Sequence, residues 1–161
     1  HVFGNENINK TASQQVKDWE SIKAEERLKK NQTGILDDVA LNLPALVRSL
    51  KLQKRAARVG FDWPKISQVL DKIDEETKEL IEAKKTEPQQ RINEEFGDLM
   101  FSIVNLGRHL KVDPEEALKQ TNRKFITRFK FVEDSIRSQG KKIEDTSLEE
   151  MEALWQQAKD P

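Results

Sequence analysis

The stretch that decides the fold reads KISQVLDKIDEETKELIEAKKTEPQQRINEEFGDLMFSIVNLGRHL and covers residues 65–110. Apolar residues recur in it every three or four positions on both sides of Pro88. This period predicts two amphipathic helices, at about 65–85 and 89–110, with a turn at 86–88. Because so short a turn joins them, the two helices should pack as an antiparallel pair.

The chain on either side shows the same helical period and no convincing two-residue alternation. We expect further helices at about 7–30, 44–59, 114–140 and 147–155. Gly60 should end the second of these, and Asp113 followed by Pro114 should start the third. Thr146 or Ser147 should cap the last one. The predicted fold is therefore all-α, like a four-helix bundle, with helical tails on either side.

Composition removes several classes of function. The chain has 28 Lys and Arg against 29 Asp and Glu, so its net charge is -1 and a nucleic-acid partner is not expected. Zero Cys and two His exclude a thiolate metal site and leave little for a His-rich zinc site. No long apolar run or signal peptide is visible, which predicts a cytoplasmic protein without a membrane partner.

Two acidic clusters lie inside the predicted helix pair. Glu76 and Glu79 are three residues apart and share a face of the first helix, and Glu95 and Asp98 do the same on the second. The short turn brings these two faces together, with Glu79 and Asp98 at matching depth. Ligands that offer only oxygen favour Mg2+ or Mn2+ over zinc. A solvated acidic face accounts for the spacing as well, so both interpretations stay open.

Polar and basic residues follow the acids along the chain. On the helix at 89–110, Ser102, Asn105 and His109 continue the polar stripe; an amide there is suited to a sugar or base edge, while His109 is expected to be structural. The helix at 114–140 interleaves basic residues with aromatic ones, which we expect to pack in the core. Cations facing metal-holding acids suit a polyphosphate. The residues concerned are Asn122, Arg123, Lys124, Arg128 and Lys130, with Phe125, Phe129 and Phe131.

The pattern Glu75-Glu76-x-x-Glu79 followed by Glu95-x-x-Asp98 resembles the signature of the MazG-type nucleoside triphosphate pyrophosphohydrolases. All-α dUTPases and phosphoribosyl-ATP pyrophosphohydrolases share this acidic form, but the surrounding sequence is similar to MazG more specifically. It includes KRAARVGFDW at 54–63, EEFGDLMF at 94–101, VNLGRHL at 104–110 and NRKFITRF at 122–129. The resemblance covers roughly residues 40–158.

This resemblance implies Mg2+-dependent hydrolysis of nucleoside triphosphates to the monophosphate and pyrophosphate, by homodimers whose active sites draw on both subunits. It implies that the metal ligands are Glu76, Glu79, Glu95 and Asp98, with Glu75 as a further catalytic carboxylate that binds metal or orients a water. It places Lys124 and Arg128 on the phosphates. Further candidates for substrate binding are Asn122, Trp63, Asn105 and Lys54.

The domain organisation is predicted from the same resemblance. Residues 1–38 are expected to be a linker and helical tail, and residues 39–161 the catalytic helical domain. The start HVFG and the later Trp19-Glu20-x-Ile22-Lys23 are similar to the end of the first domain in tandem MazG proteins, so an upstream domain is expected to be missing. Two alternatives stay open: a non-enzymatic helical interaction or dimerisation module, and a narrower all-α pyrophosphatase such as a dUTPase.

Overall fold

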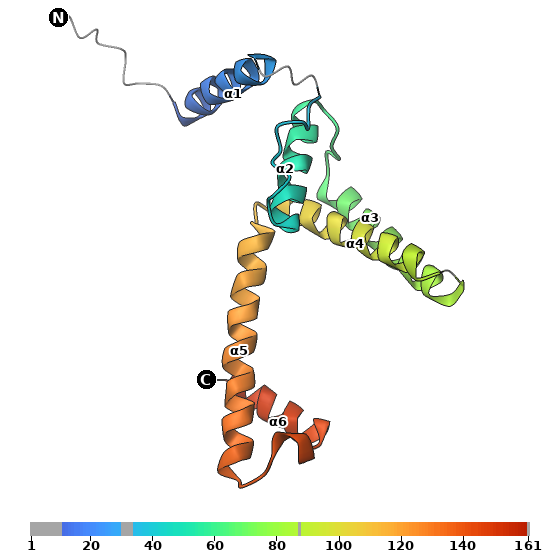
Figure 1. The fold of residues 1–161 in the computed structure, drawn as a ribbon, viewed down its shortest axis with the longest axis vertical. Coiled ribbons are helices and arrows are strands. Elements are labelled where there is room, and N and C mark those ends of the chain that lie inside the picture. Colours follow the sequence, from blue (N-terminus) through green and yellow to red (C-terminus); the bar gives the residue numbers. More distant parts are fainter. Residues whose placement is uncertain (1–10, 30–33, 87, 161) are drawn as a thin grey trace, which may run out of the picture. The chain divides into compact units, whose positions relative to one another are not determined.

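The computed structural model describes residues 11–29, 34–86 and 88–160. Its regular elements are all helical, and the described residues contain no strand, which confirms the all-α prediction (Figure 1). No helix in this described part is long and apolar enough to span a membrane. The elements are α1 (Ala12–Lys29), α2 (Ala45–Arg58), α3 (Ile66–Thr86), α4 (Gln89–His109), α5 (Pro114–Ser138), a short 3-10 helix η1 (Ile143–Asp145) and α6 (Leu148–Lys159).

The chain divides into two compact units, His1–Pro64 and Lys65–Pro161. The first contains α1 and α2, the second the remaining helices. This division by packing falls at a different place from the predicted domain boundary at 38/39, which stays a prediction. The predicted four-helix bundle would combine helices of both units and also stays a prediction.

Ion pairs join the parts of the first unit. Arg55 Nη2 lies 2.9 Å from Asp38 Oδ2, and Arg58 Nη2 lies 3.2 Å from Glu20 Oε1. As predicted, α2 stops just before Gly60, whose φ of 88° is a conformation that glycine adopts without strain. The predicted start of the first helix at residues 7–10 lies outside the described residues, and within them α1 begins at Ala12.

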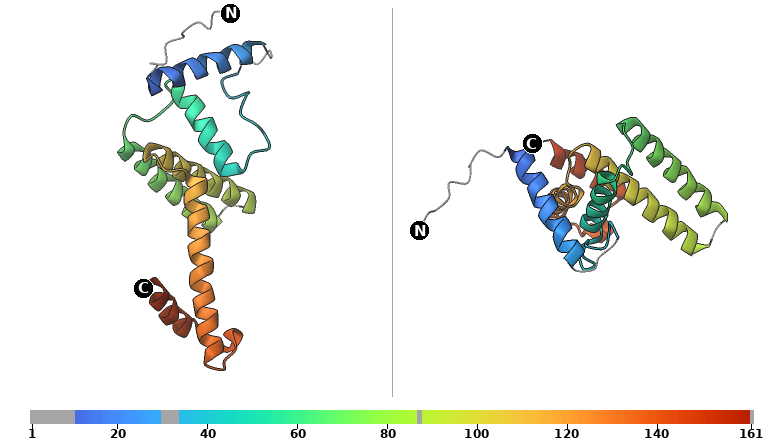
Figure 2. Two further views of the ribbon diagram at one scale, coloured as in Figure 1. Left: turned by 90° about the vertical axis from the view of Figure 1, so that its left-hand side faces the viewer. Right: turned by 90° about the horizontal axis from the view of Figure 1, so that it is seen from above.

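Helices α3 and α4 form the predicted antiparallel hairpin and lie side by side in both figures (Figures 1 and 2). Each has 21 residues, and Pro88 stands at the N-cap of α4. Val69, Ala83 and Val104 are buried. These apolar residues share the buried side of the hairpin with polar ones, which are Glu76 on α3 and Glu95, Ser102 and Asn105 on α4. The seam between the two helices is therefore partly apolar and partly polar.

Helices α5 and α6 form a second antiparallel arrangement through the turn at η1, an element that the sequence did not predict. Asp113 caps α5 by accepting hydrogen bonds from the backbone N–H groups of Glu115 and Glu116, as predicted. Ser147 caps α6, with its hydroxyl accepting from the N–H of Glu150. Helix α6 continues four residues beyond its predicted end, to Lys159.

One packing prediction was wrong for the chain by itself. Phe125, Phe129 and Phe131 were expected in the core, but all three are exposed on α5, while Val132 and Ile136 on the same helix are buried. The reason is geometric: α6 is shorter than α5 and covers only one of its faces, so side chains on the other faces of α5 stay exposed.

Candidate metal centre

Three glutamates converge on the α3–α4 hairpin. Glu76 and Glu79 lie one turn apart on α3, and Glu95 comes from α4. Each offers a carboxylate oxygen, and these three oxygens lie within 4.8 Å of one another. Glu76 is only 4% exposed and Glu95 only 2%, while Glu79 is exposed. Buried carboxylates this close repel each other unless positive charge joins them.

The helical repeat explains why acids are buried here. Val69, Glu76 and Ala83 follow one another at intervals of seven residues on α3, and all three are buried. Glu95 and Ser102 are buried at the same interval on α4. Seven residues make almost two helical turns, so each series forms one stripe along its helix. The two glutamates thus occupy positions in the seam where apolar side chains ordinarily pack.

A basic residue stands four positions before each buried glutamate. On α3, Lys72 Nζ lies 2.6 Å from Glu76 Oε1 and 3.2 Å from Glu75 Oε1. This contact with Glu76, above all its hydrogen bond, raises the pKa of Lys72 to about 12.

On α4, Arg91 makes the corresponding contacts. Its Nη2 pairs with Glu95 Oε1, and its Nη1 lies 3.3 Å from Glu94 Oε2. Each cation therefore joins two consecutive glutamates, one exposed and one buried.

The second oxygen of each buried glutamate is left without such a contact. Across the described ranges, no hydrogen-bond partner reaches Oε2 of Glu76 or Oε2 of Glu95, although both atoms are buried. A buried acceptor without a partner destabilises the fold by about 1–3 kcal/mol, and more when it is charged. An oxygen-only site with two unpaired buried carboxylate oxygens fits a hard divalent cation such as Mg2+ or Mn2+.

The pKa of Glu79 is shifted by the same cluster of carboxylates. Partial desolvation, followed by the negative charges of Glu76 and Glu95, raises the pKa of Glu79 above its ordinary value. A cation bound among the three carboxylates would reverse the electrostatic part of this shift.

The remaining predicted acids lie beside this cluster. Glu75 is exposed and pairs with Lys72, as described above. Asp98 is exposed on α4, one turn after Glu95, and does not belong to the three-carboxylate cluster found in the described residues. Sequence spacing set Glu79 level with Asp98, whereas the cluster joins Glu79 to Glu95. The ligand roles of Glu75 and Asp98 stay predictions.

Asn105 is buried near the end of α4 and already has a strong partner. Its Oδ1 accepts hydrogen bonds from Arg108 Nε at 3.1 Å and from Arg108 Nη2 at 2.8 Å. Arg108 Nη2 also lies 3.1 Å from His109 Nε2. The amide oxygen is therefore engaged within α4, and the predicted contact of Asn105 with a nucleoside stays a prediction.

The predicted phosphate-binding residues Lys124 and Arg128, with Asn122, lie on α5. Arg128 Cζ is 5.9 Å from the ring centre of Trp155 on α6, and the ring of Phe125 lies 5.3 Å from the same ring. Sequence reasoning missed Trp155, because its place beside Arg128 depends on the turn that folds α6 back onto α5.

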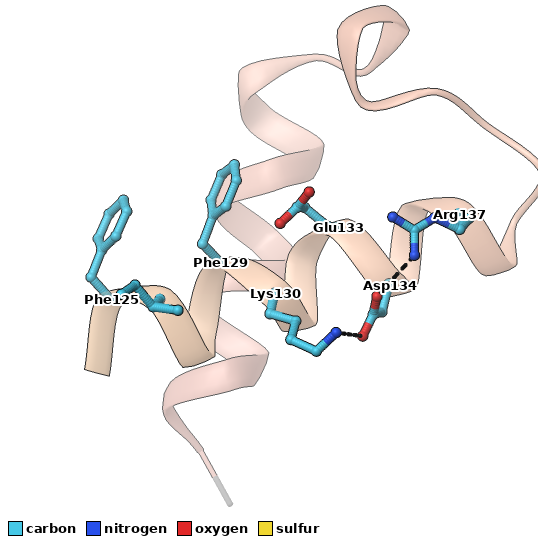
Figure 3. A pocket seen from close by; sticks show the side chains of 7 residues that line it. Phe125, Phe129, Lys130, Glu133, Asp134 and Arg137 are labelled. Carbon is cyan, nitrogen blue, oxygen red and sulfur yellow. Dashed lines mark hydrogen bonds and ion pairs between the residues drawn. The ribbon is translucent and has the colours of Figure 1, made fainter. Parts of the chain in front are cut away.

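A hollow of about 330 Å³ runs along α5, separate from the carboxylates (Figure 3). One end is apolar, with Phe125 and Phe129, and the other carries an ion-paired group formed by Lys130, Asp134 and Arg137. All its lining residues belong to one helix, so it is an open surface groove. Neither Lys124 nor Arg128 lines it.

The last two predicted substrate contacts, Lys54 and Trp63, belong to the first unit. Lys54 lies on α2 and Trp63 follows it, and both are exposed. Their roles stay predictions.

The two cations at the carboxylates were also missed, although the sequence contains a signal for them. Residues 72–79 read KIDEETKE and residues 91–98 read RINEEFGD. Both segments follow one pattern: a basic residue, Ile, Asp or Asn, two Glu, two variable residues and a final acid. Aligning these two octapeptides would have identified Lys72 and Arg91 as equivalent parts of the site.

Fold and site together define an all-α protein with a carboxylate centre in a helical hairpin. Residues 65–132 match the MazG nucleotide pyrophosphohydrolase domain. The chain is 44% identical over 99% of its length to a nucleoside triphosphate pyrophosphohydrolase of Escherichia coli K12. It has the same identity over the same share to a nucleoside triphosphate pyrophosphohydrolase/pyrophosphatase MazG of Thermotoga maritima. This match and the two identities confirm the resemblance to the MazG family that the sequence motifs predicted.

The alignments cover different shares of the relatives. The chain spans 61% of the length of the Escherichia coli protein and 59% of the Thermotoga maritima protein. It is also 40% identical, over 88% of its own length, to the uncharacterized protein YabN of Bacillus subtilis, of which it spans 29%. The chain thus spans less than two thirds of the length of each of these relatives.

Proposed function

We propose that this chain hydrolyses nucleoside triphosphates to nucleoside monophosphates and pyrophosphate in the presence of Mg2+. One observation carries the proposal: three carboxylates meet in the hairpin, and two of them keep a buried oxygen without a hydrogen-bond partner among the described residues. A solvated acidic face does not bury carboxylates in this way, because the desolvation would go uncompensated. The names of the two relatives, nucleoside triphosphate pyrophosphohydrolase in both cases, support the hydrolytic part of this proposal.

Glu76, Glu79 and Glu95 would hold the cation, and we propose Asp98 as a fourth ligand. When bound, Mg2+ would acidify its water and neutralise charge on the phosphate oxygens. Water attacks a phosphorus, the bond to the bridging oxygen breaks, and pyrophosphate leaves with that oxygen. Glu75 is exposed beside the cluster and is assigned the role of orienting the attacking water or taking its proton.

The phosphate oxygens that the cation does not neutralise need positive partners. We assign this role to Lys124 and Arg128, which are four residues apart on α5 and share a face. We propose that Asn122 also contacts the phosphate groups of the substrate. Trp63, Asn105 and Lys54 are proposed as further substrate contacts, on the basis of the family motifs in which they stand.

We further propose that the active form is a homodimer. Large apolar side chains are exposed on the hairpin and on α5, among them Phe96, Phe101, Phe125 and Ile126. A second copy that covered them would remove this apolar surface from water. Light scattering of the purified chain tests this directly, and a monomer at assay concentration that retains full activity would contradict it.

The activity is tested by incubating the full chain with ATP, GTP, CTP, UTP and dUTP, with Mg2+ and then with excess EDTA. We expect monophosphate and pyrophosphate as products, lost on chelation. Glu95→Gln should be inactive, and Glu82→Gln, an exposed acid on α3 that pairs with Lys85, is the matched control. Turnover of dUTP alone would favour the narrower pyrophosphatase. No turnover and no stabilisation by Mg2+ would favour an interaction module.

A further inference from the structure

We propose that Lys72 and Arg91 are positioning residues of the metal centre, each holding one oxygen of a buried glutamate so that the other oxygen is left for the cation. This inference rests on the proposed function, because it assumes a divalent cation among Glu76, Glu79 and Glu95. It concerns two residues that neither hold the cation nor belong to the acidic signature.

The geometry of each half supports this role. Lys72 contacts Oε1 of Glu76, and the atom without a hydrogen-bond partner is Oε2 of the same carboxylate. Arg91 contacts Oε1 of Glu95, and again Oε2 is the atom left over. A carboxylate held at one oxygen keeps its side-chain torsions fixed, so its second oxygen is presented in one place. In metal sites generally, hydrogen bonds to the ligands set their orientation in this way.

The arrangement occurs twice, on two different helices. The cation stands three residues before an exposed glutamate and four before a buried one, at Lys72 on α3 and at Arg91 on α4. The octapeptides 72–79 and 91–98 share this order of residue types. The two copies bring the equivalent residues Glu76 and Glu95 together, with carboxylate oxygens within 4.8 Å of each other, while Asp98, the counterpart of Glu79, lies outside the cluster found in the described residues. The same pairing of a cation with two consecutive glutamates on both helices indicates that the two cations have the same role.

Stability alone gives a weaker account of these pairs. The side chains of Arg91 and Lys72 are 51% and 30% exposed, while those of their partners Glu95 and Glu76 are 2% and 6% exposed, so each pair neutralises a buried charge. Neutralisation alone does not require that one oxygen of each carboxylate be left without a hydrogen-bond partner. Both cations reach the most buried acids of the hairpin. Their contacts thus act on the two carboxylates that have least freedom to find another partner.

The test measures binding of Mn2+ to the full chain by calorimetry, without nucleotide. Lys72→Gln and Arg91→Gln should each weaken the affinity by about 10- to 100-fold, the usual effect of removing a group that orients a metal ligand. The charge-conserving variants Lys72→Arg and Arg91→Lys should recover most of the loss. Lys85→Gln is the control, because Lys85 pairs with Glu82 at 2.8 Å on the same helix and both are exposed.

Circular dichroism melts in EDTA establish which variants are folded. If Lys72→Gln does not fold, Arg91→Gln tests the same claim at the more exposed cation. Affinities of the folded glutamine variants within twofold of the wild type, or tighter than it, would overturn the inference while leaving the proposed function intact. A wild-type chain that neither binds Mn2+ nor hydrolyses nucleotides would instead overturn the proposed function, and this inference with it.

Discussion

Glu76 and Glu95 approach the same point from opposite helices: a carboxylate oxygen of each lies within 4.8 Å of the other, and both side chains are buried. Oε1 of each glutamate pairs with a cation on its own helix, Lys72 or Arg91, while Oε2 of each has no hydrogen-bond partner among the described residues. The two unpartnered oxygens destabilise the metal-free hairpin at this point, and a bound cation would relieve that cost.

Glu95→Gln should separate the stability of the protein from its activity. Loss of one negative charge relieves repulsion among the three carboxylates, so the melting temperature in EDTA should rise. The rise on adding Mg2+ should shrink, and turnover should disappear, because a ligand is lost. Thermal melts with and without Mg2+, together with product analysis, check this. Normal turnover in Glu95→Gln would show that the carboxylate is not a ligand.

The stability of the metal-free protein should depend on the ionisation of Glu79. Its pKa is raised in the folded state, so the folded protein binds this proton more tightly than the unfolded chain does. The stability from this group is fully present below the ordinary carboxyl pKa and is lost as the pH rises through the raised value. Urea unfolding in EDTA, from about pH 4 to about pH 7, should show this decline relative to Glu79→Gln. Parallel curves for the two proteins would refute it.

Asp98→Asn tests the predicted ligand that stands outside the three-carboxylate cluster. Asp98 is exposed, so the substitution should change the free energy of unfolding by no more than about 0.5 kcal/mol. If Asp98 joins the centre when cation and substrate bind, turnover should still be abolished. Kinetics and urea unfolding of the same preparation give both quantities. Full activity would restrict the centre to Glu76, Glu79 and Glu95.

Lys124→Gln should weaken substrate binding without disturbing the fold. A charge-assisted hydrogen bond to phosphate contributes about 1.5–3 kcal/mol, so KM should rise by about tenfold or more. Lys119→Gln is a suitable control, because Lys119 is an exposed lysine on the same helix that pairs with Glu116. Equal KM values for the two variants would remove Lys124 from the proposed phosphate site.

Asp113→Ala should destabilise α5 by removing its N-cap. The carboxylate accepts from the N–H groups of Glu115 and Glu116, and loss of such a cap lowers the free energy of unfolding by about 1 kcal/mol. Urea denaturation measures the effect, and Asp113→Asn should retain most of the stability. No change in Asp113→Ala would mean that the first turn of α5 is stabilised by other contacts.

Local signals allowed much of the fold to be predicted. The apolar period of three to four residues, Gly60 as a helix end and Asp113 with Pro114 as a helix start are all encoded within a few neighbouring positions. The exposure of Phe125 and the place of Trp155 were not predictable in this way. Both depend on which helix faces cover each other, and an apolar stripe does not specify its partner.

The same distinction applies to the candidate site. Glu76, Glu79 and Glu95 could be selected because helical spacing puts them on facing sides of a short hairpin. The spacing did not reveal that two of them would be buried in the seam, nor that Lys72 and Arg91 would take up one oxygen of each. Both features follow from the seven-residue stripe of α3, in which Glu76 lies between Val69 and Ala83 and is buried with them. A search for apolar residues at helical spacing passes over the polar members of such a stripe.

The three carboxylates and both cations lie between residues 72 and 95, on either side of one tight turn. Closing so short a segment has a small entropic cost, and contacts that are local in sequence form early when a chain folds. The centre can thus assemble before α5 and α6 have found their places. A divalent cation captured at that stage would favour the folding nucleus itself, so that it would accelerate refolding as well as stabilise the finished structure.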